Sequence, residues 1–546
     1  MQRLGIAILL GGGALLAAAA LLWPAGQSIA DAFRGDIETR PLSGRQLGLL
    51  LRGVRVAVES AMVSQLIAIG IAAGLSRNAG LIRSITGWFC LCTVLTPTYI
   101  HAYSWSLLVL PAGVATSRAL AGPMHEWLLT EGRAVWCLAT WMSPIAAAML
   151  AVGWREAGRA VFGVAQLDAA TPSAARVASH ALRPWLMISL IICFAIALTE
   201  FAVCHLSLCL TWNTEILSLM QDQASPGGVL RLAWPLIGVV VICGAALWPF
   251  RGMIRRGFTG EHRELGSNLT IGAGRWPRIA AATWIISLSI LAAPTTIMAL
   301  SLQSLTGFSQ LGAIYTDHVR WSAITATASV AISIWIALAF EFLRLRRITR
   351  RESTRARDAV ATDGARRSPI SIVASLPEII VLVAAILLAI TPPALVGDAF
   401  ASAYARIPLI RDHWIIVSMV GAARFGVVML LALRIAAPRE LGELARTDGA
   451  SAWQELWCVR LPAARRTVAA AAMVVFVLAF NEIATTLLIV PPNVGSLPKT
   501  LLNAIHFGRN DAVIAMCLSV VALVGATAFV LMATPRSAKK SVRLSI

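Results

Sequence analysis

The chain has 546 residues, of which 58% are hydrophobic and only 13% are charged. A soluble protein of this length needs more polar surface to cover its cores, so a soluble enzyme, a disordered chain and a fibrous repeat are excluded. The composition instead predicts an all-α polytopic membrane protein, and the net charge of +19 is explained by basic loops between apolar runs rather than by nucleic-acid binding.

Apolar runs of about 20 residues predict twelve membrane-spanning helices. The predicted spans are Leu4–Trp23, Val54–Leu75, Trp88–Val109, Ala134–Trp154, Trp185–Leu208, Val229–Phe250, Ile279–Leu300, Trp321–Leu343, Ile370–Ile390, His413–Ile435, Thr467–Val490 and Asp511–Ala533. The first run is longer than the apolar region of a signal peptide, so we interpret it as a retained span.

Charge asymmetry sets the predicted orientation. With the N-terminus inside, the inner segments contain 31 Lys and Arg residues and the outer loops contain 11. Positive charge concentrates on the cytoplasmic side of membrane proteins. The sequence therefore predicts a multi-pass protein of the cell inner membrane, in contact with its lipid, with both termini in the cytoplasm.

The chain divides into two similar halves. The fifth span contains Glu200 and the eleventh contains Glu482, within sequences that share Phe, Ala, Glu and Ala at the same spacing, 282 positions apart. We predict a first six-helix permease-like half at residues 1–255, a cytoplasmic connector at 256–278 and a second six-helix half at 279–546. The Arg-rich stretch Leu345–Ala365 is interpreted as a flexible linker within the second half.

Several polar side chains fall inside predicted spans, where a charge is costly. Glu200 and Glu482 are candidates for lining a translocation path. We weigh this role evenly against a structural one, in which each accepts hydrogen bonds from a neighbouring helix. Glu378 and Arg424 are expected to form a structural ion pair. For His101, Tyr99 and Tyr103 we favour a place in a polar seam between helices. The less favoured alternative is that these side chains contact the substrate.

The inner loop before the eleventh span has a distinctive order of residues. Residues 443–447 suit a short helix, Gly449 allows a left-handed turn, and Ser451 can cap a second helix over 452–459, which Pro462 is expected to end. This pattern predicts a surface helix–turn–helix. The apolar side chains expected on its partner-binding face are Trp453, Leu456 and Trp457. The alternative is an interfacial helix that contacts lipid headgroups only.

This segment resembles the coupling motif of ATP-binding-cassette importer permeases, and the sequence after it resembles the ferric-iron and thiamine branch of that family. The residues at the motif positions are Glu443, Ala445, Gly449, Ala450, Leu461 and Pro462. The resemblance implies that the loop docks a cytoplasmic ATPase, in two copies, and that a periplasmic or lipid-anchored protein delivers substrate. It implies ferric iron as the first candidate substrate, with thiamine, polyamines and phosphonates as others.

The corresponding loop of the first half, residues 166–184, fits the motif less well. The residues that match are Asp168, Ala169, Ala170 and Pro184. Asp168 and Pro184 are 16 positions apart, against 19 for Glu443 and Pro462, and the glycine is missing. We therefore expect weaker docking there, or a loop of another shape.

The sequence has no phosphate-binding loop of the GxxxxGK[ST] type, so ATP hydrolysis by that route requires a separate subunit. We predict no catalytic residues, no metal site and no cofactor in this chain. The main alternative is a secondary transporter of twelve spans, which also has two similar halves but needs no ATPase dock. A membrane enzyme is the least favoured class, because no loop gathers a catalytic set of residues.

Overall fold

The computed structural model describes residues 2–34, 43–76, 80–109, 127–156, 171–216, 228–250, 252–253, 275–361, 376–436, 439–506 and 510–533. Within these ranges every regular element is helical and no strand occurs. Ten helices there are long and apolar enough to cross a membrane. The protein is thus an all-α, multi-pass membrane protein, as its composition predicts.

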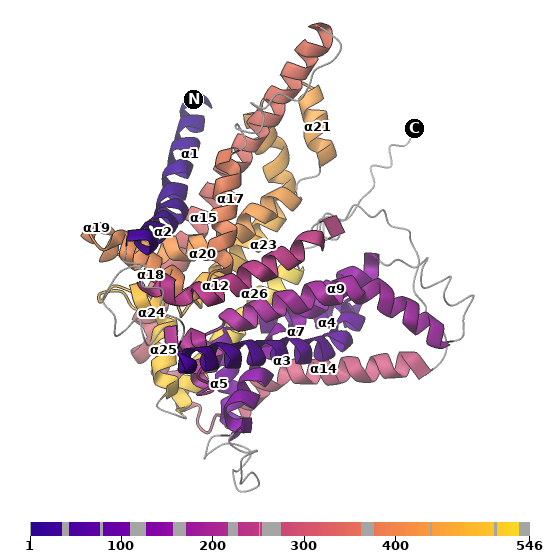
Figure 1. Ribbon diagram of the computed structural model, residues 1–546, viewed down its shortest axis with the longest axis vertical. Helices are drawn as coiled ribbons and strands as arrows, with labels where there is room; N and C mark the ends of the chain where they lie inside the picture. The colour runs from indigo at the N-terminus through magenta and orange to yellow at the C-terminus, as the bar shows by residue number, and fades with distance from the viewer. Residues whose placement is uncertain are drawn as a thin grey trace. The chain divides into compact units, whose positions relative to one another are not determined.

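The ten membrane-length helices account for ten of the twelve predicted spans (Figure 1). They lie in α1 (Gln2–Ala17) with η1 (Ala18–Leu22) and α2 (Trp23–Arg34), α3 (Gly44–Leu75), α7 (Glu131–Glu156), α9 (Thr171–Thr199), α12 (Gly228–Leu247) with η3 (Trp248–Phe250), α14 (Arg275–Ser301), α15 (Thr306–Ala361), α20 (Ile415–Ala436), α22 (Ala452–Gln454) with η4 (Glu455–Arg460) and α23 (Leu461–Phe480), and α26 (Asp511–Ala533).

The other two predicted spans are interrupted by proline. Trp88–Val109 is not one helix: α4 (Leu81–Leu95) and α5 (Thr98–Val109) are separate, because proline at position 97 forces Thr96 into an extended conformation. The indole N–H of Trp141 donates to the Thr96 carbonyl at 3.0 Å, so the break leaves that carbonyl bonded. Likewise α17 (Leu376–Ile390) stops before Pro392, and α18 (Pro393–Tyr404) follows it.

Helix order repeats along the chain with an offset of 282 positions. Subtracting 282 from α20 gives 133–154, which lies inside α7, and subtracting it from α26 gives 229–251, which matches α12 with η3. The long helices α9 and α23 end beside Glu200 and Glu482, and each is followed by a short helix, α10 (Ala202–Leu206) or α24 (Thr486–Ile489). The repeat of two halves remains a prediction that this order supports.

The chain forms two compact units, and each contains segments from both sequence halves. Unit 1 comprises Met1–Pro41, Ile216–Ile237 and Tyr315–Thr500, and unit 2 comprises Leu42–Glu215, Gly238–Ile314 and Leu501–Ile546. In unit 1 the Tyr404 hydroxyl donates to the Ala19 carbonyl at 2.7 Å. In unit 2 the Ser287 hydroxyl donates to the Ile67 carbonyl at 3.0 Å. The first helix of each half thus packs on helices numbered within the other half.

Helix α15 is unusually long, with 56 residues, or about 84 Å at about 1.5 Å per residue. The predicted flexible linker Leu345–Ala365 is therefore wrong as far as Ala361, and residues 362–365 lie outside the described part of the chain. Two features account for the helix: Leu345 is fully buried, and Glu352 pairs with Arg446 of α21 (Arg439–Thr447). In Figure 1, α21 runs beside the end of α15.

Candidate functional site

The turn of the surface segment, residues 439–462, has the geometry that its sequence predicts. Helix α21 ends at Thr447, and Gly449 takes a left-handed conformation with φ of +81°. The N–H of Ala450 bonds to the Ala445 carbonyl at 2.9 Å, and that of Gly449 to the Arg446 carbonyl at 3.0 Å. These are the two bonds of a Schellman cap, in which glycine adopts the left-handed conformation without strain.

The second helix begins with a capping box. The Ser451 hydroxyl accepts from the N–H of Gln454 at 3.4 Å, and the Gln454 side chain accepts from the N–H of Ser451 at 2.9 Å. Two backbone donors that would otherwise be unbonded are thus satisfied. The predicted cap at Ser451 is confirmed.

Pro462 does not end this helix, contrary to the sequence-based expectation. The chain continues from α22 through η4 into α23, and Pro462 occupies the first turn of α23. A proline inside an α-helix removes a hydrogen bond and clashes with the carbonyl four residues earlier. The wider π-helical turn η4 lies directly before Pro462, and such turns accommodate residues that an α-helix cannot.

A chain of ion pairs, which we call the charge chain, fixes the surface segment to α15. It consists of Glu341, Arg344 and Glu352 of α15 with Arg446, Glu455 and Arg460 of the surface segment. Arg460 donates to Glu341 at 3.0 Å and to Glu455 at 2.9 Å. Arg446 donates to Glu455 at 2.9 Å and to Glu352 at 2.9 Å. Arg344 donates to Glu341 at 2.9 Å.

The centre of the charge chain is buried. The side chains of Glu341, Glu455 and Arg460 are 3%, 0% and 5% exposed. Removing one partner of a buried ion pair leaves an uncompensated charge. Gly442 makes room for this arrangement, since a Cβ there would lie 2.6 Å from Glu455 Oε1.

The charge chain is not predictable from the local sequence pattern. Its one signal in the sequence is the group of opposite charges at positions 446, 455 and 460, which lies among the apolar residues of the surface segment. Glu341 is 119 positions from Arg460, and nothing in the local pattern relates the two.

The apolar face of the surface segment differs from the predicted one. Leu456 is fully buried, and Trp453 packs edge-to-face on Phe342 with ring centroids 5.8 Å apart. Of the three predicted residues only Trp457 is exposed, and Leu444 is exposed with it. The charged motif residue Glu443 and the turn residue Gly449 are exposed, Ala445, Ala450 and Leu461 are half-buried, and Pro462 is exposed.

The first-half counterpart is described in part. Asp168, Ala169 and Ala170 lie outside the described residues, and Pro184 lies inside helix α9. As in the second half, the proline that follows the loop is accommodated within a helix.

Glu482 forms an ion pair with Arg424 of α20, and both side chains are largely buried. The expected pairing of Arg424 with Glu378 stays a prediction, because the Glu378 side chain lies outside the described residues. Glu482 Oε1 also accepts from the N–H and the hydroxyl of Thr485, at 3.1 and 3.0 Å. The carboxylate thus stabilises the chain break between α23 and α24.

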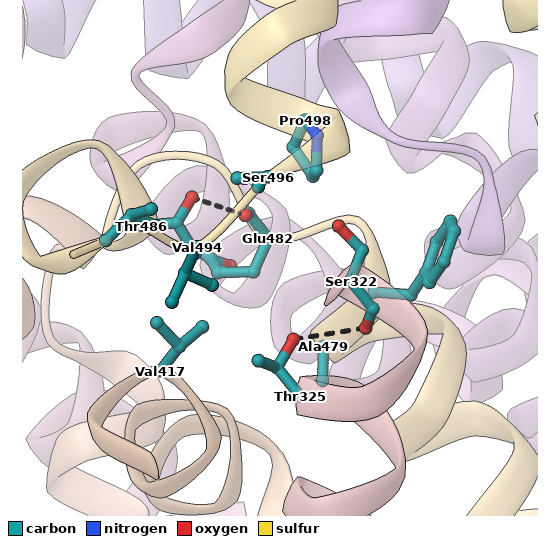
Figure 2. A pocket seen from close by; sticks show the side chains of 12 residues that line it. Ser322, Thr325, Val417, Ala479, Glu482, Thr486, Val494, Ser496 and Pro498 are labelled. Carbon is teal, nitrogen blue, oxygen red and sulfur yellow. Dashed lines mark hydrogen bonds between the residues drawn. The ribbon is translucent and has the colours of Figure 1, made fainter. Parts of the chain in front are cut away.

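Glu482 also lines a small pocket, which has room for about one water molecule in this conformation (Figure 2). Figure 2 shows Ser322, Thr325 and Val417 across the pocket from Thr486 and Ser496. Four hydroxyl side chains and the Glu482 carboxylate line this pocket together with apolar residues. Polar groups within a membrane-spanning unit are costly and often functional.

Glu200 holds the equivalent position of the first half. Its Oε1 accepts from the Thr98 hydroxyl at 2.8 Å and from the N–H of Ala202 at 3.1 Å. The carbonyl of Thr199, freed by the break, accepts from the Asn213 side chain at 2.7 Å. Each matched glutamate therefore bonds to the backbone just after its helix ends.

His101 lies in the polar seam that the sequence predicts. Its Nε2 lies 2.8 Å from the Thr140 hydroxyl and 3.3 Å from the indole N–H of Trp105. The Tyr99 and Tyr103 side chains are 1% exposed, which buries all three residues of the seam in unit 2. This confirms the inter-helix interpretation.

The chain was compared with known protein families, curated proteins and solved structures. Residues 360–534 match the family described as binding-protein-dependent transport system inner membrane component. No curated protein and no solved structure matches the chain. The matched region contains the surface segment, the charge-chain residues Arg446, Glu455 and Arg460, and the Arg424–Glu482 pair. Residues 360–534 are thus similar to the inner membrane component of binding-protein-dependent transport systems.

Proposed function

We propose that the chain is the fused permease subunit of an ATP-driven importer, with both permease halves in one polypeptide. The observation that carries the proposal is the surface segment, in which two caps and a left-handed turn present Glu443, Leu444 and Trp457 outward. These side chains offer an apolar anchor beside a negative charge, which suits docking into a groove of a partner protein.

In this proposal the surface segment binds a cytoplasmic ATPase, and the charge chain carries its movement to α15. Arg446 and Arg460 both connect the segment to α15, through Glu352 and Glu341. Two connections at separate points of one helix resist rotation of the segment more than a single pair does. A displacement of the segment by the partner would then move α15 with it.

The proposed assembly contains two ATPase copies and a periplasmic or lipid-anchored binding protein, in the inner membrane, with both termini of this chain in the cytoplasm. By resemblance, ferric iron is the first candidate substrate. Thiamine, polyamines and phosphonates are the other candidates. A binding protein outside this chain would set the specificity.

Glu200 and Glu482 are proposed to border the translocation path. The pocket beside Glu482 supports this for the second half, because hydroxyl groups line it together with the Glu482 carboxylate, which is paired with Arg424. If the path opens here, a solute would meet hydroxyl groups and a carboxylate whose charge Arg424 already balances. Such a lining permits passage without binding tightly.

Co-purification tests the proposal. The chain is tagged at its C-terminus and extracted in mild detergent, and its partners are identified by mass spectrometry. We expect an ATP-hydrolysing cassette subunit to co-purify with the wild-type chain and to be lost from Gly449→Arg, because the long side chain lies on the docking face and the turn is strained.

Gly449→Asn is the matched control, because asparagine tolerates a left-handed conformation far better than other residues. It should keep the partner. A chain that purifies alone and moves solute across vesicles without ATP would be a secondary transporter, and the proposal would be wrong. Partner binding that is equal in wild type and Gly449→Arg would remove the surface segment from the docking site.

A further inference from the structure

Two histidines that are distant in sequence face each other in unit 2. His205 lies in α10, and His506 is the last residue of α25 (Leu497–His506). Their Nε2 atoms are 3.1 Å apart, and the rings meet edge-to-face with centroids 4.9 Å apart. In a neutral pair one ring nitrogen must donate its proton to the other. When neither Nε2 atom carries a proton, the lone pairs of both atoms point into the space between the two rings.

The position of His205 is fixed by its surroundings. Its ring stacks on Phe201, with centroids 5.0 Å apart, and Phe201 is buried. Arg133 donates to the Leu206 carbonyl at 2.8 Å, which anchors the end of α10. His506 is exposed, so solvent reaches the pair from its side. A fixed ring opposite an accessible one favours ligand binding, because little order is lost when the ligand binds.

We propose that His205 and His506 together bind one divalent transition-metal ion, of the Zn²⁺ or Cu²⁺ class, through their Nε2 atoms. Tetrahedral zinc with bonds of about 2.0–2.1 Å holds two nitrogen ligands about 3.3 Å apart. The observed separation of 3.1 Å reaches that value with a small rotation of the exposed ring. Imidazole is a preferred ligand of both metals.

Water supplies the remaining ligands. Among the described residues no group of three or more His, Cys, Asp or Glu side chains is arranged to hold a metal ion. The site therefore exchanges its ion with solvent and is not a closed structural centre. Structural zinc sites have four protein ligands, whereas open sites keep positions for water.

The location of the pair determines which ions reach it. Helix α10 follows the span Leu182–Thr199, and α25 precedes the span Asp511–Ala533. By the predicted orientation, α9 leads toward the external side and α26 returns from it, so α10 and α25 lie at the external ends of these spans. A bound ion would tie α10 to α25, and on the proposed function it would restrain transport from outside. Metal binding itself does not depend on the proposed function.

A zinc titration of the purified full-length chain in lipid nanodiscs tests the site. Competition with a chromophoric chelator measures the affinity for Zn²⁺. We expect one equivalent to bind, and both His506→Ala and His205→Ala to weaken it by about tenfold or more, since even outer partners of metal ligands cost about that much. His413→Ala is the matched control: His413 is exposed in unit 1, rests on Trp414 and should leave the affinity unchanged.

Two further readouts separate a metal site from a damaged fold. Without metal, the thermal unfolding midpoint of His506→Ala should equal that of the wild-type chain. Electron paramagnetic resonance of bound Cu²⁺ should show two coordinated nitrogens in wild type and not in His506→Ala. Zn²⁺ affinity that is the same in wild type and both histidine variants, or no binding by the wild type, would overturn the proposal. So would an equal loss in His413→Ala.

Discussion

Arg460 joins two carboxylates that are far apart in sequence, with its guanidinium 3.0 Å from Glu341 and 2.9 Å from Glu455. All three side chains are nearly inaccessible to solvent. A guanidinium suits this position because its fork of donors serves two carboxylates at once and remains charged when buried. The contact therefore joins the surface segment to α15 within unit 1.

Replacing Glu455 with glutamine should destabilise the protein sharply. Arg446 and Arg460 would each lose a buried partner, and breaking a buried ion pair costs about 3–5 kcal/mol. The thermal unfolding midpoint of the purified chain should fall. Glu443→Gln is the control, since Glu443 is exposed on the same segment, and its midpoint should stay at the wild-type value. Equal midpoints for both variants would contradict a stabilising charge chain.

The Arg424–Glu482 pair allows structure and transport to be separated. Glu482→Gln alone leaves Arg424 buried without its counter-charge and should lower stability by about 3 kcal/mol or more. The double variant Arg424→Met/Glu482→Gln removes both charges and retains an acceptor for Thr485, so we expect stability close to wild type. Unfolding midpoints measure the first effect.

Uptake by the stable double variant then tests the path. If Glu482 borders the path, uptake at limiting substrate should change although the fold is intact. Wild-type uptake in the double variant would assign Glu482 a structural role only.

Close packing of α3 against α14 gives a third prediction. A Cβ at Gly70 would lie 2.4 Å from both the Ser287 hydroxyl and the Thr283 carbonyl, whereas a Cβ at Gly48 of the same helix meets nothing within 4 Å. Gly70→Ala should therefore destabilise unit 2 by about 1–3 kcal/mol. Gly48→Ala should be neutral or stabilising by up to about 1 kcal/mol. The order of their unfolding midpoints checks this, and a reversed order would refute the close contact.

Local features of the fold were predictable from the sequence because neighbouring residues determine them. The turn at Gly449 and the cap at Ser451 follow from conformational preference and side-chain reach over three residues. The long apolar runs predict most spans, because lipid leaves the backbone few alternatives to a helix. The matched Glu200 and Glu482 marked both points where a long helix ends.

Tertiary contacts decided the features that the sequence did not predict. Arg424 had more than one carboxylate available in the predicted spans, and only the tertiary packing shows that it pairs with Glu482. The stretch after Leu345 looked like a linker because its charges were expected to face solvent, yet Arg446 binds Glu352 within it. Trp453 and Leu456 were assigned to a partner, but α15 covers them. The His205–His506 pair likewise joins residues 301 positions apart.

Photo-crosslinking at Leu444 tests the central claim most directly, because this side chain is 60% exposed on the surface segment. A photoreactive amino acid is placed at position 444, and, as a control, at position 529, where Phe529 is 65% exposed on the membrane-spanning helix α26. The proposed function predicts a crosslink from position 444 to an ATP-hydrolysing subunit, and none from position 529. Crosslinks from position 444 to lipid alone, in cells that express the whole transport system, would contradict it.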